Sequence, residues 1–259
     1  MPVFFTGTNV IILGLLASLA AGLATSVGAI PIFFKQDISK KIMNCLLGFA
    51  AGVMLAATSF SLIIPSIESG GGGIKGAGIA LGGILIGGIF LDFVDKMFPD
   101  TNLMAGPGKN HNNIRRAWLF VLAITIHNFP EGMAVGVGFG DGNIANGLSL
   151  AIAIGLQNIP EGLAVALPLR REGYSRLKAF GAAVCTGLVE PMGGLLGVGL
   201  IQVARPLLPW TLAFAAGAML FVIAYEIIPE TQKDSASKMA VHVMLLGFVI
   251  MMFLDNVLG

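Results

Sequence analysis

Residues 127–132 read His-Asn-Phe-Pro-Glu-Gly, and residues 157–162 read Gln-Asn-Ile-Pro-Glu-Gly. Each hexapeptide lies in the middle of an apolar run that is long enough to span a lipid bilayer. A charged carboxylate at the centre of a membrane costs about 2.5–3.5 kcal/mol even on the most lenient insertion scale. Two glutamates at that depth, beside a histidine and two asparagines, favour a bound cation between the two segments. We therefore expect a divalent-metal site.

The composition predicts a helical protein that crosses a membrane several times. Of the 259 residues, 56% are hydrophobic and 11% are charged, and the mean hydropathy is +0.88. A soluble domain carries about 25% charged residues, so lipid is the expected surrounding. The net charge of +1 gives no indication of a nucleic-acid partner. We expect an all-α, multi-pass protein of the cell membrane, either an inner or a plasma membrane.

Eight apolar segments follow one another along the chain, each close to the roughly 20 residues that a bilayer core requires. They lie near 10–34, 42–66, 77–97, 117–139, 146–168, 179–204, 210–230 and 239–257. All Lys and Arg residues except Lys75 and Arg205 fall in alternate connections or at the adjoining end of the third segment. The positive-inside rule places those connections in the cytoplasm and both termini outside. The longest connection, 98–116, is polar and is expected to be a mobile cytoplasmic loop.

An internal repeat relates the second segment to the seventh. Residues 49–55, Phe-Ala-Ala-Gly-Val-Met-Leu, match residues 214–220, Phe-Ala-Ala-Gly-Ala-Met-Leu, and each run is followed by a proline, Pro65 or Pro229. The two segments cross the membrane in opposite directions, as do the two that carry the hexapeptides. Inverted repeats with a binding site between them are a common transporter design. We expect a 3+2+3 arrangement of helices in a single domain, residues 1–259.

The hexapeptide side chains lie three or four residues apart, so each set shares one helix face. The candidate ligands are His127, Asn128 and Glu131 in the fourth segment and Gln157, Asn158 and Glu161 in the fifth. Pro130 and Pro160 have no N–H, and they are expected to kink both helices at the depth of the polar groups. Hydrogen bonds between helices remain an alternative role for the two asparagines.

Imidazole, carboxylate and amide ligands without a thiolate suit Zn²⁺ first, then Fe²⁺, Mn²⁺ or Cd²⁺. Glu190, near mid-depth in the sixth segment, is assigned to the same site. Met54 lies at a similar depth in the second segment, where ordinary packing is an equal alternative. Glu226 and Glu230, at the cytoplasmic end of the seventh segment, could form an exit site, although solvation alone would also explain Glu230.

These motifs resemble the Zrt-, Irt-like protein (ZIP) family of divalent-metal transporters, in particular its GufA-like bacterial branch. The resemblance is carried by the two hexapeptides, by Val189-Glu190-Pro191 and by Phe49-Ala-Ala-Gly-Val-Met54, and it covers essentially the whole chain. It implies eight helices with both termini outside and import of Zn²⁺ or related ions into the cytoplasm. Such proteins are often homodimers, in which a transport domain moves against a scaffold.

The resemblance also implies a centre for two metal ions. One ion would be bound by His127, Glu131, Gln157, Glu161 and Met54. The other would be bound by Asn128, Asn158 and Glu190 together with the shared glutamates.

The sequence offers less support for two other functions. An intramembrane metalloenzyme such as a zinc protease would carry His-Glu-x-x-His, whereas this chain has His127 and Glu131 with no second histidine nearby. A proton-coupled carrier of a small organic solute could use the glutamates as proton relays, but few aromatic or Arg side chains lie at mid-depth to hold an organic anion. We therefore expect a transporter without enzymatic activity, whose only bound cofactor is the transported ion.

Overall fold

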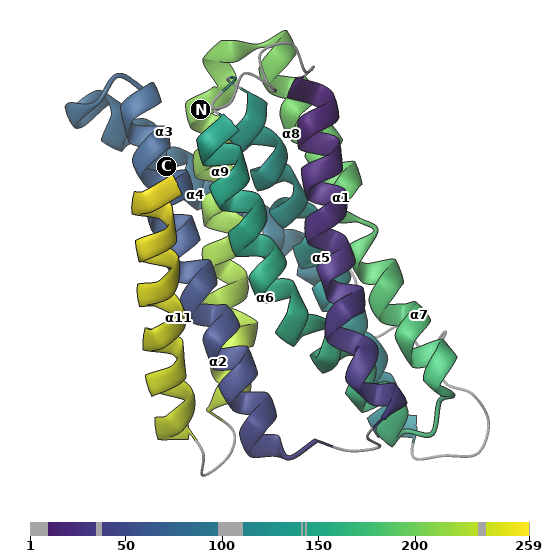
Figure 1. Ribbon diagram of the computed structural model, residues 1–259. Coiled ribbons are helices and arrows are strands. Elements are labelled where there is room, and N and C mark those ends of the chain that lie inside the picture. The colour runs from purple at the N-terminus through teal and green to yellow at the C-terminus, as the bar shows by residue number, and fades with distance from the viewer. Residues whose placement is uncertain are drawn as a thin grey trace.

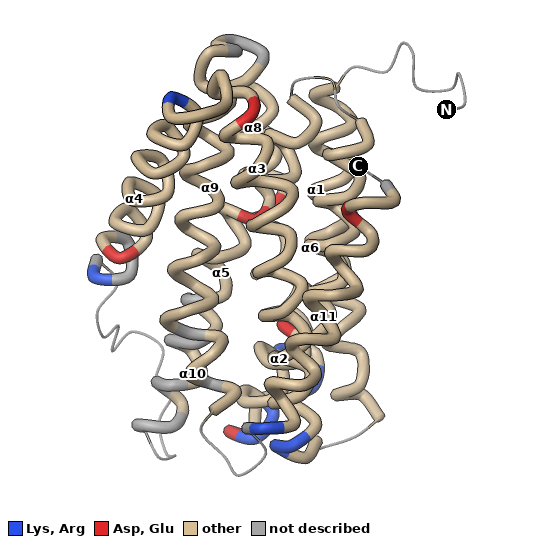
Figure 2. Tube along the Cα trace, turned by 90° about the vertical axis from the view of Figure 1, so that its left-hand side faces the viewer, with Lys and Arg blue, Asp and Glu red and all other residues tan. Residues whose placement is uncertain are grey.

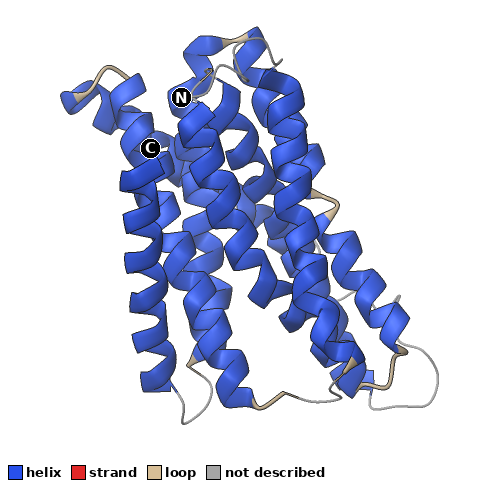
Figure 3. Ribbon diagram, viewed as in Figure 1, coloured by secondary structure: helices blue, strands red, loops and turns tan. Residues whose placement is uncertain are grey.

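The computed structural model describes residues 10–34, 38–97, 111–140, 142, 144–232 and 237–258. Helices form almost all of this described part, and it contains no β-strand (Figure 3). In chain order the elements are α1 (Val10–Ala29), η2 (Ile30–Phe33), α2 (Lys40–Ala57), η3 (Thr58–Ile63), α3 (Ile64–Ser69), α4 (Gly73–Met97), α5 (His111–Gly140), α6 (Ile144–Arg171), α7 (Arg176–Gly187), α8 (Glu190–Val203), η5 (Arg205–Leu207), α9 (Leu208–Val222), η6 (Ile223–Ile227), α10 (Ile228–Thr231) and α11 (Ser237–Leu258).

Seven helical segments of the described chain are long and apolar enough to cross a membrane. They are Val10–Phe33, Lys40–Ser69, Gly73–Phe93, Ile144–Arg171, Arg176–Ile201, Leu208–Tyr225 and Lys238–Val257. The 30-residue helix α5, which carries the first hexapeptide, packs among them but is not one of the seven. The prediction of an all-α, multi-pass membrane protein is confirmed, whereas the number of eight spans stays a prediction.

The helices run side by side between two ends of different charge. The first turn of α1 and the last turn of α11 lie at the same end of the bundle (Figure 1). Most of the Lys and Arg residues in the described part lie at the opposite end (Figure 2). The predicted mobile loop, 98–116, lies largely outside the described residues, which resume at His111.

Two of the long helices contain a wider π-helical turn that the sequence patterns did not predict. In η3 the N–H of Ile64 bonds to the carbonyl of Ser59, and in η6 the N–H of Ile228 bonds to the carbonyl of Ile223. After one intervening residue, each wide turn is followed by a proline, Pro65 or Pro229, which cannot donate a backbone hydrogen bond. Turns of this kind occur at functional sites, and here they stand at equivalent places in the two repeats.

The sixth apolar segment is broken in the middle, which the sequence patterns also did not predict. Helix α7 ends at Gly187 and α8 begins at Glu190. Because unbonded N–H groups give a helix N-terminus a partial positive charge, the break suits the acidic residue that begins α8. Pro130 and Pro160 lie inside helices α5 and α6, which continue through them, and the kinks expected at these prolines stay a prediction.

The strongest helix pairings form two equivalent sets. Helix α1 packs on α6 and α5 packs on α8, while α2 packs on α11 and α4 packs on α9. Glycines allow these approaches: a Cβ atom on Gly52 would lie 1.9 Å from the carbonyl oxygen of Met244, and one on Gly217 would lie 2.1 Å from that of Ile84. Small residues serve this purpose in membrane bundles because they let backbones touch.

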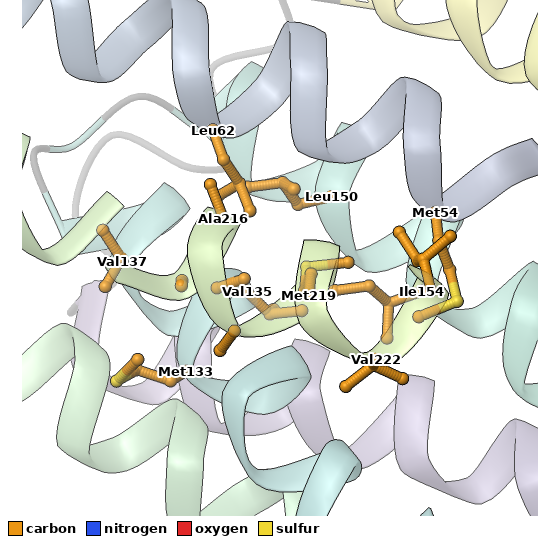
Figure 4. Close-up of a cluster of buried hydrophobic side chains, with 14 of the residues drawn as sticks. Met54, Leu62, Met133, Val135, Val137, Leu150, Ile154, Ala216, Met219 and Val222 are labelled. Carbon is orange, nitrogen blue, oxygen red and sulfur yellow. The ribbon is translucent and has the colours of Figure 1, made fainter. Parts of the chain in front are cut away.

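A cluster of apolar side chains fills the space between these pairs (Figure 4). It brings together Met54 and Leu62 from the second segment, Val135 from α5, Ile154 from α6 and Met219 from α9. The buried core therefore lies where α2 and α9 face α5 and α6.

Replacing Gly52 by Ala should destabilise the fold, because the new methyl group would overlap the backbone of α11. Overpacking of this kind costs about 1–3 kcal/mol. The matched control is Gly181→Ala in α7, where a Cβ atom would meet nothing within 4 Å. Thermal unfolding in detergent should show a clear loss for Gly52→Ala and none for the control. Equal unfolding temperatures would contradict the close packing of α2 on α11.

Candidate metal centre

The two hexapeptides place six polar side chains inside the bundle, and all six are buried. The solvent-exposed fraction of His127 is 4%. It is 1% or less for the other five, which are Asn128, Glu131, Gln157, Asn158 and Glu161. Their spacing along α5 and α6 puts each set on one helix face, and the two helices pack directly on each other. The predicted candidates of the fourth and fifth segments are therefore brought together.

A hydrogen bond between side chains joins α5 to α6 at this level. The side-chain amide of Gln157 donates from Nε2 to Oε1 of Glu131 at 2.7 Å. The interaction holds a buried carboxylate against the neighbouring helix, and hydrogen bonds to charged groups are the stronger ones. Gln157, which was predicted from its spacing alone, thus contacts a predicted ligand of the other segment.

A second set of hydrogen bonds brings in α8 and α1. The amide of Asn158 donates from Nδ2 to Oε1 of Glu190 at 2.6 Å and to the backbone carbonyl of Ala21 at 2.8 Å. Glu190 is completely buried at the start of α8. The assignment of Glu190 to the same cluster as the hexapeptides therefore agrees with its position in the fold.

The three buried carboxylates act on one another electrostatically. The charge of Glu161 interacts with both Glu131 and Glu190, and Glu190 also acts on Glu131. Like charges in a low-dielectric interior repel strongly. The centre is therefore suited to a cation.

Several oxygen atoms of the centre have no hydrogen-bond partner among the described residues. They are Oε2 of Glu131, Oε2 of Glu190, Oε1 of Gln157 and Oδ1 of Asn158. The oxygen and the nitrogen of the Asn128 side chain also have no hydrogen-bond partner among the described residues. Buried polar atoms normally have partners, and oxygen atoms of carboxylates and amides can ligate a divalent ion.

The cluster does not form a ready-made metal site from charged side chains alone. Among the described residues, no three His, Cys, Asp or Glu side chains are arranged so that they could hold an ion together. The amide N–H groups of Gln157 and Asn158 bond to the carboxylates in this arrangement. An ion bound to those carboxylate oxygens would displace the amide N–H groups. The amides would then either move away or turn so that their oxygen atoms face the ion.

The last residue of each hexapeptide has a packing role that sequence analysis missed. A Cβ atom on Gly132 would lie 2.0 Å from the carbonyl oxygen of Glu190, and one on Gly162 would lie 1.8 Å from that of Thr25. Only glycine permits such contact, so Gly132 brings the glutamate of α5 to α8, and Gly162 brings that of α6 to α1. The repeated Pro-Glu-Gly signature contained this information.

Thr25 is a second residue of the centre that was missed. It occupies in α1 the place that Glu190 occupies in α8, because each is the contact of a hexapeptide glycine. Its side chain is fully buried, and its hydroxyl has no hydrogen-bond partner among the described residues. A single threonine in an apolar helix gives no local signal, and only the internal repeat could have indicated it.

Met54 is fully buried in the apolar cluster of Figure 4, together with Ile154 of α6. Ile154 precedes Gln157 by three residues and so lies on the same helix face. The thioether therefore lies beside the centre, and both ligation and packing fit its position. The backbones of Glu226 and Glu230 belong to η6 and α10, but their side chains lie outside the described residues.

A separate polar cavity of about 410 Å³ lies near the end of the bundle where α11 finishes. Its lining includes Glu68, Asn146 and Asp255, and Ser149 donates a hydrogen bond to Oδ1 of Asp255 at 3.3 Å. Along α6 the order is Asn146, then the apolar Leu150 and Ile154, then the polar centre. On this face of α6 an apolar layer therefore lies between the cavity and the centre.

Comparison with known proteins agrees with the geometry. The family model described as ZIP Zinc transporter matches residues 104–255. The chain is 45% identical over 251 residues to the zinc transporter GufA of Myxococcus xanthus, covering 95% of this chain and 99% of the relative. It is 41% identical over 261 residues to the zinc transporter ZIPB of Bordetella bronchiseptica, covering 98% and 84%. Human zinc transporter ZIP11 is 34% identical over 321 residues, covering 91% and 94%.

Replacing Asn158 by Ala should destabilise the protein, because it leaves the Glu190 carboxylate and the Ala21 carbonyl without their donor. An unsatisfied buried group of this kind costs about 1–3 kcal/mol. Asn256→Ala is the control, since that amide donates to the carbonyl of Met252 from an exposed position. The apparent unfolding temperature in metal-free detergent should fall for the first variant alone. An unchanged value for Asn158→Ala would argue against the hydrogen-bonded link between α6 and α8.

Proposed function

Because the chain belongs to the ZIP family of divalent-metal transporters, we propose that it imports Zn²⁺ into the cytoplasm through the centre between α5, α6 and α8. The chain is a transporter of divalent metal ions and not an enzyme. Neither the intramembrane metalloenzyme nor the organic-solute carrier is favoured. Zn²⁺ is selected as the substrate because the relatives are named as zinc transporters, and Fe²⁺, Mn²⁺ and Cd²⁺ are further ions to test.

One observation carries the proposal for the site: three glutamates from three helices are buried within electrostatic range of one another. Glu131, Glu161 and Glu190 retain at most 1% of their exposed surface. A divalent ion among them would offset most of the charge that burial penalises. In a ZIP protein such an ion is the transported substrate.

We assign the ligands to two ions that share glutamates. The first ion would be held by His127, Glu131, Gln157, Glu161 and Met54. The second would be held by Asn128, Asn158 and Glu190 with the same two central glutamates. Support comes from the unpartnered oxygens of Gln157 and Asn158, which would turn toward an ion when their N–H groups leave the carboxylates.

For the membrane topology we propose eight spans in a 3+2+3 arrangement within a single domain, with α5 as the eighth. Exchanging the first three spans with the last three, and α5 with α6, converts the pairing of α1 with α6 into that of α8 with α5. The same exchange converts the pairing of α2 with α11 into that of α9 with α4. Both termini would lie outside, opposite the basic end in Figure 2, and the cell membrane is the proposed location.

The transport route would run from the cavity beside Glu68 and Asp255, through the apolar layer, to the centre. An exit site at Glu226 and Glu230 would then pass the ion to the basic, cytoplasmic side. The apolar layer closes the outer half in the present conformation, so the two units must rock or slide to admit an ion. The homodimer and the mobile loop at 98–116 are proposed from the resemblance and the sequence.

The glycine contacts support movement as two units. Close backbone approaches join α1, α5, α6, α7 and α8 to one another, as at Gly22 against Gly187 and Gly136 against Gly194. Others join α2 to α11 and α4 to α9, as at Gly52 and Gly217. Between the two groups lies the apolar cluster. Contacts between its side chains would let one group of helices slide past the other more readily than the close backbone contacts within each group would.

Replacing Glu131 by Gln should abolish transport, because the variant keeps the shape of the side chain but loses its charge. The measurement is the initial rate of radiolabelled Zn²⁺ uptake into proteoliposomes, which should fall to the rate of empty vesicles. Asp92→Asn is the control, since Asp92 pairs with Lys96 at 2.6 Å near the exposed end of α4. Uptake by Glu131→Gln at the wild-type rate would refute the proposed site.

Zn²⁺ uptake should weaken as the external pH is lowered from neutral. Carboxylate and imidazole groups bind metal only when deprotonated, so protons compete with the ion and the apparent affinity decreases with decreasing pH. Initial rates at subsaturating Zn²⁺ across a pH series, with the internal pH held constant, would measure the effect. Rates that rise on acidification would contradict competition and indicate that protons drive the import.

A further inference from the structure

The internal repeat extends from the sequence to individual contacts. One constant offset in residue number relates Gly22 to Gly187, and a Cβ atom on each would meet the carbonyl oxygen of the other, at 2.2 and 2.1 Å. The same offset relates Thr25 to Glu190, the two residues that contact the hexapeptide glycines. It also relates Met54 of α2 to Met219 of α9.

The ligand set proposed for the first ion is nearly symmetric under this relation, with one exception. Exchanging α5 with α6 converts His127 into Gln157 and Glu131 into Glu161, so these four ligands exchange among themselves. Met54 alone has no counterpart in the set. Its counterpart in the fold is Met219, which the proposed function does not use.

Met219 lies close to Met54 on the outer side of the centre. It retains 1% of its exposed surface and belongs to the same apolar cluster as Met54 and Ile154 (Figure 4). The hydroxyl of Thr58 contacts its sulfur at 3.9 Å. Since Thr58 follows Met54 by one helical turn, Met219 lies about 6 Å further toward the outer cavity.

We propose that Met219 is a second thioether ligand, which replaces Met54 when the centre moves toward the outer side. The inference rests on the proposed function, because it assumes that the centre carries the ion. In the present conformation the unit of α1, α5, α6, α7 and α8 places the centre beside Met54. Displacement of this unit outward by about one helical turn would bring the same ligands to Met219.

A thioether at both positions has a chemical consequence that packing does not explain. Sulfur ligands favour soft ions, so two methionines raise the preference for Cd²⁺ over Zn²⁺ at both ends of the movement. Leucine would fill either position about as well as methionine, since exchanges between the two conserve volume. The Thr58 hydroxyl donates to one lone pair of the Met219 sulfur and leaves the other available for a metal ion.

The test compares the ratio of Cd²⁺ to Zn²⁺ uptake in proteoliposomes for Met219→Leu, Met219→Cys and Met54→Leu. Met251→Leu is the control, because Met251 is fully buried on α11 in a separate apolar cluster. Both leucine variants of the proposed ligands should lower the ratio by roughly tenfold, the lower end of what lost metal-site interactions cost. Met219→Cys should keep or raise the ratio, because its sulfur remains a soft ligand, whereas the control should leave it unchanged.

The outcomes separate ligation from packing. A wild-type ratio in Met219→Leu, or a fall in Met219→Cys as large as in Met219→Leu, would overturn the role of Met219. If Met219→Leu lowers the ratio only as far as Met251→Leu does, the proposal is likewise overturned. A wild-type chain without Zn²⁺ uptake, or with full uptake in Glu131→Gln, would overturn the proposed function and the Met219 proposal with it.

Discussion

Three carboxylates buried in one low-dielectric interior dominate the design of this protein. Water is the usual solvent of a charged glutamate, and Glu131, Glu161 and Glu190 have almost none. Protein groups replace part of the missing hydration. The Gln157 amide donates a hydrogen bond to Glu131, and the Asn158 amide donates one to Glu190, which also lies at the positive N-terminus of α8. These groups reduce the electrostatic cost without removing it, so a cation is still favoured. The broken sixth span belongs to the same arrangement, because the break creates the helix N-terminus beside the cluster.

Close backbone packing is what brings these charges together. Gly132 and Gly162 follow the two hexapeptide glutamates directly, and each allows its helix to touch a neighbour, at Glu190 or at Thr25. The centre is thus built on rigid helices that contact one another through backbone atoms. Against α2 and α9, by contrast, the same helices present aliphatic and methionine side chains. This difference in packing gives the molecule one unit that carries the polar centre, and an apolar interface between this unit and helices α2 and α9.

The two halves of the centre are related by the repeat but are chemically unequal. His127 corresponds to Gln157, and Glu190 corresponds to Thr25. A symmetric pair of sites would bind an ion equally from either side, whereas this arrangement places imidazole on α5 and a third carboxylate on α8. The π-helical turns in η3 and η6 are shared by both halves, each followed by a proline. The scaffold of the repeat is therefore more symmetric than the ligands that it holds.

The sequence by itself determined the class of protein, the approximate bounds of the helices and most members of the polar centre. It could do so because hydropathy and the three- and four-residue spacing are local properties, and because buried glutamates demand compensation wherever they occur. Only the tertiary structure decided which amide bonds to which carboxylate, since the pairs Gln157–Glu131 and Asn158–Glu190 join different helices. The break before Glu190, the wide turns of η3 and η6 and the place of Thr25 likewise depend on contacts between distant segments. A local pattern cannot encode these features, because they arise where one helix meets the backbone of another.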